Sequence, residues 1–160
     1  VQYYRLPVTD VARPEDKDVE DFIRLVENNP NSWFHFHCIA GFGRTTIFMV
    51  MYEILKTASL GSMRLEDIVT RQLDLGKENW LFKTFFSVQR QTMDFLENFH
   101  RYVKEGYGQM SWTEWVHKQN LQEFESEPFK GPWWKPTNLK TNLKFEGMMA
   151  YMEVAQLYRF

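Results

Sequence analysis

One stretch, "WFHFHCIAGFGRTTIFMVMYEIL" at residues 33–55, constrains the fold of this chain more than any other. Its alternating aromatic residues at 33–37 predict a β-strand. A loop containing Gly41 and Gly43 follows, and the segment from Thr45 is apolar nearly all round, which predicts a helix buried in the middle of a domain. Strand, loop and buried helix should therefore form one unit.

Bulky residues occupy both faces of the predicted strand. Trp33, His35 and His37 should point one way, and Phe34 and Phe36 the other. This pattern favours an inner strand that is covered on both faces.

The other segments predict a strand in "VQYYRLPV", then a helix from Pro14 to Glu27 that Asn28, Asn29 and Pro30 end. Helices are expected within 62–76, where Ser62 is a candidate N-cap and Gly76 a candidate stop, within 80–106, and within 111–120. We expect an α/β fold with a central, mostly parallel sheet flanked by helices, over residues 1–119. Residues 120–160 should be an irregular extension rich in Trp and Pro, with a last helix in "MMAYMEVAQLYRF".

Cys38 and Arg44 are separated by five residues in the loop between strand and helix. Backbone N–H groups of such a loop converge on one point at a helix N-terminus, which attracts an anion. The same setting stabilises a thiolate, and the arginine fork can bind two oxygens of a phosphoryl group. Thr45 can donate its hydroxyl to the sulfur when an intermediate breaks down. The predicted phosphate-binding residues are Ile39, Ala40, Gly41, Phe42, Gly43 and Arg44.

A phosphate ester needs a proton donor for its leaving group, and Asp10 is the best candidate. It lies in "VTDVARP", directly after a strand, where ligands bind in open α/β sheets. Asp10 could instead cap the helix that begins near Pro14. Asp16 and Asp18 are the other candidates for the acid.

Arg13, Lys17 and Lys83 are candidates for lining the pocket of a polyanionic substrate, although scattered basic residues are usually solvated surface. His35, His37 and Cys38 invite a metal interpretation, but no fourth ligand is evident, so we expect neither a metal nor another cofactor.

The amino-acid composition limits the classes of partner that we expect the chain to bind. Nineteen Lys and Arg against twenty-one Asp and Glu give a net charge of −2, which argues against nucleic-acid binding. The longest apolar runs are too short for a membrane span. Aromatic residues make up 17% of the chain, so some rings should face a partner or a missing part of the fold.

The spacing Cys-x5-Arg, with Gly41 and Gly43, resembles the phosphate loop of the protein tyrosine phosphatase (PTP) superfamily. With "TDVARP" upstream and "EDIVTRQLDLG" downstream, the chain is most similar to the bacterial PTP-like inositol polyphosphatases, the cysteine phytases, from about Tyr4 to about His117. The resemblance implies that Cys38 is the nucleophile and that Arg44 binds the phosphate. It implies that Asp10 is the general acid and later the general base. It also implies that Thr45 assists turnover and that His37 orders the loop.

The sequence departs from those phytases at several points. They commonly have Glu after the nucleophile and His after the acid, where this chain has Ile39 and Val11. They also carry more lysines ahead of the long helix. Their catalytic domain includes further strands and helices before the acid, so we expect this chain to be a C-terminal portion that packs against an N-terminal segment absent from it.

We therefore expect hydrolysis of phosphomonoesters through a cysteinyl-phosphate, with inositol polyphosphates as the favoured substrates. Phosphotyrosine proteins or phosphoinositides are the alternative substrates, and a catalytically weak phosphate-binding module is a further alternative. The sequence does not decide whether the protein is secreted, lies in the periplasm or is delivered into a host cell by a bacterium.

Overall fold

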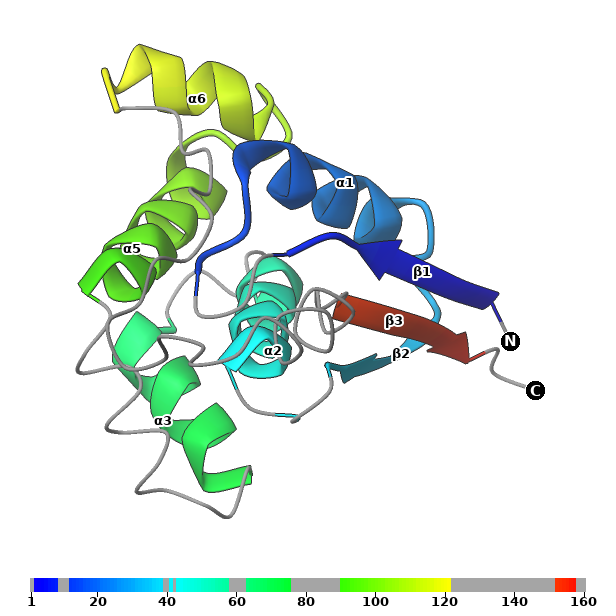
Figure 1. The fold of residues 1–160 in the computed structure, drawn as a ribbon. Helices are drawn as coiled ribbons and strands as arrows, with labels where there is room; N and C mark the ends of the chain where they lie inside the picture. The colour runs from blue at the N-terminus through cyan, green and yellow to red at the C-terminus, as the bar shows by residue number, and fades with distance from the viewer. Residues whose placement is uncertain are drawn as a thin grey trace, which may run out of the picture.

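The structure, a computed structural model, describes residues 2–8, 12–38, 41, 43–57, 63–75, 90–121 and 152–157. Its elements, in chain order, are β1 (Gln2–Leu6), α1 (Asp16–Glu27), β2 (Trp33–His37), α2 (Gly43–Thr57), α3 (Leu65–Leu75), α5 (Arg90–Glu105), α6 (Trp112–Lys118) and β3 (Met152–Leu157) (Figure 1).

The helices lie where the sequence places them. Helix α1 begins two residues after Pro14 and ends at Glu27, and α5 ends one residue before Gly106. The short helix α6 begins with a capping box, in which the Ser111 hydroxyl accepts from the Glu114 N–H while the Glu114 carboxylate accepts from the Ser111 N–H. Ser62 and Gly76, the expected ends of the third helix, lie outside the described residues.

The described strands form a three-stranded sheet in the order β1-β3-β2, and both ladders are antiparallel. This differs from the expected mostly parallel sheet, because β3 enters between β1 and β2, which run parallel to each other (Figure 1). The helix expected in "MMAYMEVAQLYRF" is also wrong, since residues 152–157 form β3. Pairing with a strand on either side outweighs the local helical preference of this segment. The extension is thereby joined to the sheet of the first 119 residues.

Only one face of β2 is packed against the core. The ring centroid of Phe36 lies 6.0 Å from that of Phe22 in α1 and 5.5 Å from that of Tyr52 in α2. Phe34 also packs on Tyr52. On the other face Trp33 is 62% exposed and His35 is exposed. The expectation of a strand covered on both faces is therefore wrong for these residues.

Helix α2 is the centre of the core, as its all-round apolar sequence predicts. Phe48, Val50 and Met51 are fully buried, and the helix packs against β2, α3 and α5. In the part of the chain that the structure describes, no helix is long and apolar enough to cross a membrane.

Candidate active site

Cys38 directly follows β2, and Thr45 lies in the first turn of α2, so the strand and the helix bring the two residues together. The Thr45 hydroxyl accepts a hydrogen bond from the Cys38 N–H at 3.0 Å and donates one to the Cys38 Sγ at 3.2 Å. Both side chains are buried. The hydroxyl hydrogen is thus directed at the sulfur, where it favours a thiolate.

The surroundings of Cys38 lower the pKa of its thiol. Burial is the largest single influence and raises this pKa. Acting against it are hydrogen bonds from the Thr45 hydroxyl and from the backbone of Thr45 and Gly41, and the charge of Arg44. Together they outweigh burial, so the pKa lies below its ordinary value and a larger share of Cys38 is an ionised nucleophile.

Arg44 is the second residue of α2, and its side chain is buried. Its Nη1 donates to the backbone carbonyl of Val8 at 3.3 Å. Val8 is the last described residue before Asp10, so Arg44 connects the start of α2 with the residue that precedes the segment of the expected acid.

Gly41 adopts a left-handed backbone conformation, with φ +73°. Residues with a Cβ avoid this region at a cost of roughly 1–2 kcal/mol. A Cβ built at Gly41 would meet no atom within 4 Å, so the backbone conformation and not crowding accounts for the glycine. This turn directs the Gly41 backbone to the sulfur.

The chain is similar in sequence to a family of known proteins. Residues 1–56, which include Cys38 and Arg44, match the model of the PTP-like phytase family, whose description is inositol hexakisphosphate. The uncharacterized protein AvrBs1.1 of Xanthomonas campestris pv. campestris is 36% identical over 92 residues, which span 51% of this chain and 86% of AvrBs1.1. AvrBs1.1 of Xanthomonas euvesicatoria matches to the same extent. The chain belongs to the PTP-like phosphatase family.

A second relative is much longer than this chain. The effector protein hopD2 of Pseudomonas syringae pv. tomato is 29% identical over 133 residues, or 75% of this chain. The chain spans only 27% of the length of hopD2. No solved structure matches the chain.

Several expected site residues lie outside the described residues. They are Asp10, Ile39, Ala40, Phe42 and Lys83. The acid role of Asp10 and the phosphate contacts of the loop backbone at 39, 40 and 42 therefore stay predictions.

The two described candidates for the substrate pocket engage carboxylates of the protein itself. Arg13 donates to Asp16 Oδ1 at 2.9 Å, and its side chain is only 10% exposed. Lys17 is 77% exposed and pairs with Asp21 on the next turn of α1. Of the two, Arg13 is fixed and buried, whereas Lys17 lies on the solvated surface.

His37 ends β2 next to Cys38, and its ring lies 5.6 Å from that of His35. Both histidines are on the strand face opposite Phe36, the face that also carries Trp33. No group of three or more His, Cys, Asp or Glu within the described ranges comes together to hold a metal ion.

Two features of this region have no signal in the amino-acid sequence. One is the Val8 carbonyl, a backbone acceptor with no side-chain signal. The other is the environment of Asp18, which is 2% exposed and has an Oδ2 without a hydrogen-bond partner in the described part of the chain. Burial, and then repulsion from Glu15, raise the pKa of Asp18 to about 6. Its third position in α1 suggests a cap, but its burial has no sequence signal.

Proposed function

We propose that the protein hydrolyses phosphomonoesters through a covalent phosphocysteine and needs no metal ion for this reaction. The observation that carries the proposal is the double hydrogen bond between Thr45 and Cys38, beside Arg44 in the first turn of α2. The Cys38 thiolate attacks phosphorus and the ester oxygen leaves with a proton. Water then attacks the phosphocysteine, and the departing sulfur regains its hydrogen bond from Thr45.

Each described residue supplies a distinct part of this chemistry. The Gly41 backbone and the N-terminus of α2 offer N–H groups to phosphoryl oxygens, and the planar Arg44 side chain can bind two of those oxygens at once. Asp10 donates the proton to the leaving group and later accepts one from water. We propose for the complete domain the α/β fold expected from the sequence, with this loop between a strand and a buried helix.

Inositol polyphosphates are the substrates we propose, because the matching family carries inositol hexakisphosphate in its description. Phosphotyrosine proteins and phosphoinositides are the alternative. The specific observation that favours this alternative is the pairing of both described basic candidates, Arg13 and Lys17, with carboxylates of the protein. A pocket for a densely phosphorylated ring needs cations that face the substrate.

We propose that this protein acts after delivery by a bacterium into a host cell, and the name of the relative hopD2, an effector protein, supports this. We further propose that an N-terminal segment absent from this chain packs on its sheet. Tyr3 and Trp33, which are 69% and 62% exposed, support this. Tyr3 of β1 and His35 of β2 pair with the same residue of β3, so their side chains lie on the same face of the sheet. Trp33 lies on this face too, because it is two residues from His35 in β2.

The test compares phosphate release from inositol hexakisphosphate and from a phosphotyrosine peptide, with Cys38→Ser as the control. Faster release from the inositol phosphate supports the proposed substrate class, and faster release from the peptide overturns it. Rapid acid quenching with labelled substrate should trap a phosphocysteine in the wild type alone. Release no greater than that of Cys38→Ser on either substrate would leave only a phosphate-binding module.

A further inference from the structure

His35 and His37 form a pair of imidazoles on the face of the sheet that lies away from the core. They are two residues apart in β2, so their side chains point to the same side of the strand. The ring centroids are 5.6 Å apart, and the ring planes are tilted by 38°. His35 is exposed and His37 is partly buried, so solvent reaches the pair through His35.

The separation of the two rings is close to that of two imidazoles bound to one metal ion. With a metal–nitrogen bond of about 2.1 Å, each ring centre lies about 3.2 Å from the ion, so two tetrahedral ligands have ring centres about 5.2 Å apart. A slightly wider angle at the ion gives the observed 5.6 Å. Rotation of the two side chains therefore suffices to direct both rings at one ion, with the backbone of β2 unchanged.

Arg5 is the cation that shares this face of the sheet. Arg5 of β1 and His37 of β2 pair with the same residue of β3, and Arg5 is exposed. Because β3 lies between them, two strand spacings of about 9–10 Å in all separate Arg5 from His37. This distance exceeds the Debye length of about 8 Å at physiological ionic strength, so repulsion of a bound cation by Arg5 is largely screened.

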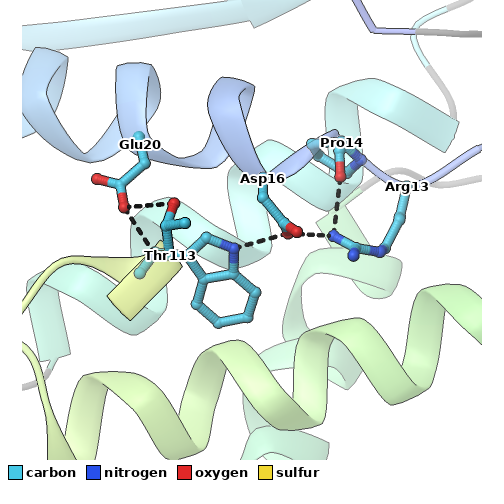
Figure 2. A network of polar contacts seen from close by, with 6 residues as sticks. Arg13, Pro14, Asp16, Glu20 and Thr113 are labelled. Carbon is cyan, nitrogen blue, oxygen red and sulfur yellow. Dashed lines mark hydrogen bonds and ion pairs between the residues drawn. The ribbon is translucent and has the colours of Figure 1, made fainter. Parts of the chain in front are cut away.

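The carboxylates at the start of α1 are poor competitors for such an ion, because the protein already uses them. Asp16 Oδ1 accepts from Arg13 Nη1 at 2.9 Å and from Trp112 Nε1 at 2.8 Å (Figure 2). Glu20 Oε1 accepts from the Thr113 N–H at 2.8 Å. Imidazole is in addition a better ligand than carboxylate for copper, nickel and zinc.

We propose that His35 and His37 bind one divalent transition ion, with copper(II) bound most tightly, as two neighbouring imidazole ligands. The expectation of no metal rested on the lack of a fourth ligand, whereas two imidazoles suffice for an exposed ion that keeps water in its other positions. Within the described ranges no group of three or more His, Cys, Asp or Glu comes together, which fits such an open site. The open positions are available to a ligand from the N-terminal segment that we propose on this face.

The inference does not rest on the proposed function. The ion takes no part in the phosphatase reaction, and Cys38 is not one of its ligands. The site can therefore be tested in a chain that cannot hydrolyse phosphate esters.

The experiment titrates copper(II) chloride into the full chain with Cys38→Ser and without an affinity tag, followed by calorimetry. The serine removes a thiolate that would itself bind and reduce copper. His35→Gln and His37→Gln are added to this parent one at a time, and His117→Gln is the matched control. His117 is an exposed histidine on α6, and the chain has four histidines in all.

We expect one tightly bound copper ion per parent chain, with an electron paramagnetic resonance spectrum that shows two imidazole nitrogens. Loss of a group that only supports a metal ligand costs about 10–100-fold in affinity, so loss of an imidazole ligand should weaken copper binding at least ten-fold. His117→Gln should leave the affinity unchanged. Nickel(II) and zinc(II) should bind to the same site less tightly than copper(II).

An affinity for copper that is the same in His35→Gln as in the parent would overturn the site, and so would a spectrum without two imidazole nitrogens. A loss as large in His117→Gln would also overturn it, because it would place the ion elsewhere. Should His37→Gln fail to fold, His35→Gln decides, because it changes an exposed side chain. Phosphate release by the wild type no greater than that of Cys38→Ser would remove the proposed function and leave the metal site in place.

Discussion

Thr45 is bonded to Cys38 in two directions: its hydroxyl oxygen accepts from the Cys38 backbone N–H at 3.0 Å, and its hydroxyl hydrogen is donated to the Cys38 sulfur at 3.2 Å. The first contact holds the oxygen in place, which leaves the hydrogen available to the sulfur. A buried thiol is thereby ionised more readily than burial alone allows.

Thr45→Val, which keeps the shape of the side chain and removes the hydroxyl, should raise the pKa of the Cys38 thiol. Because a hydrogen bond to a charged group is worth about 1.5 kcal/mol or more, we expect alkylation of Cys38 by iodoacetamide at about pH 6 to slow roughly ten-fold. Cys38 is the only cysteine of the chain, so the rate reports on one thiol.

Thr45→Ser is the matched control for this measurement. It retains the hydroxyl and should keep an alkylation profile close to that of the wild type. If the valine and serine variants show the same profile, the Thr45 hydroxyl does not set the pKa of Cys38.

Gly41→Ala should reduce both stability and activity through the backbone alone. A Cβ at this position meets no neighbour within 4 Å, but φ is +73°. We expect a loss of about 1 kcal/mol in the free energy of unfolding, measured by urea titration, together with a lower kcat/KM. Gly41→Asn should lose less, because asparagine tolerates the left-handed region better. A larger loss for asparagine than for alanine would point to crowding instead.

The parts of the site that sequence alone predicts are those carried by local pattern. Alternation at 33–37, the glycines and the apolar run after Thr45 place Cys38 between β2 and α2, and the structure has this arrangement. The prediction that Cys38 is the nucleophile rests on residue types at fixed spacing, which require no knowledge of distant contacts.

The features that sequence did not predict depend on contacts between distant segments. β3 lies between β1 and β2 because their free edges offer it hydrogen bonds on both sides, whereas its own residues favour a helix. From the sequence alone, Arg13 is indistinguishable from a cation on the surface. In the structure it donates to Asp16, which also accepts from Trp112. Neither arrangement has a periodicity that a local reading could detect.

Asp18→Asn should stabilise the protein at neutral pH. Burial and repulsion from Glu15 raise the pKa of Asp18 to about 6 from its ordinary 3.8, so the folded state favours the protonated carboxyl. This contribution to stability is fully present below the unfolded pKa and is lost as pH rises through about 6. Asparagine has no charge to bury, and we expect it to raise the free energy of unfolding at neutral pH by about 1–3 kcal/mol.

The measurement is urea unfolding of wild type and Asp18→Asn across this range of pH. The two unfolding free energies should differ most above the folded pKa and converge as pH falls toward the unfolded value. Asp21→Asn, on the exposed side of the same helix, should show no such gain. A constant difference at every pH would mean that ionisation of Asp18 does not cause the effect.

Asp10→Asn should separate the acid role from a structural role at the start of α1. Departure of a poor leaving group needs a full proton transfer, whereas an activated aryl oxygen leaves as the anion. We therefore expect kcat/KM on phenyl phosphate to fall by roughly 10²-fold or more and that on 2,4-dinitrophenyl phosphate to fall far less. Asp21→Asn, which lies outside the site, serves as the control for a lost carboxylate.

Equal losses on both esters would remove Asp10 from the acid role and direct attention to Asp18. Asp16 is not the alternative donor, because its Oδ1 already accepts hydrogen bonds from Arg13 and from Trp112. Asp18 has a raised pKa and an Oδ2 without a hydrogen-bond partner in the described ranges, so it would carry a proton near neutral pH more readily. In that case the dependence on the leaving group should appear in Asp18→Asn, and its absence from both variants would exclude general-acid catalysis by either residue.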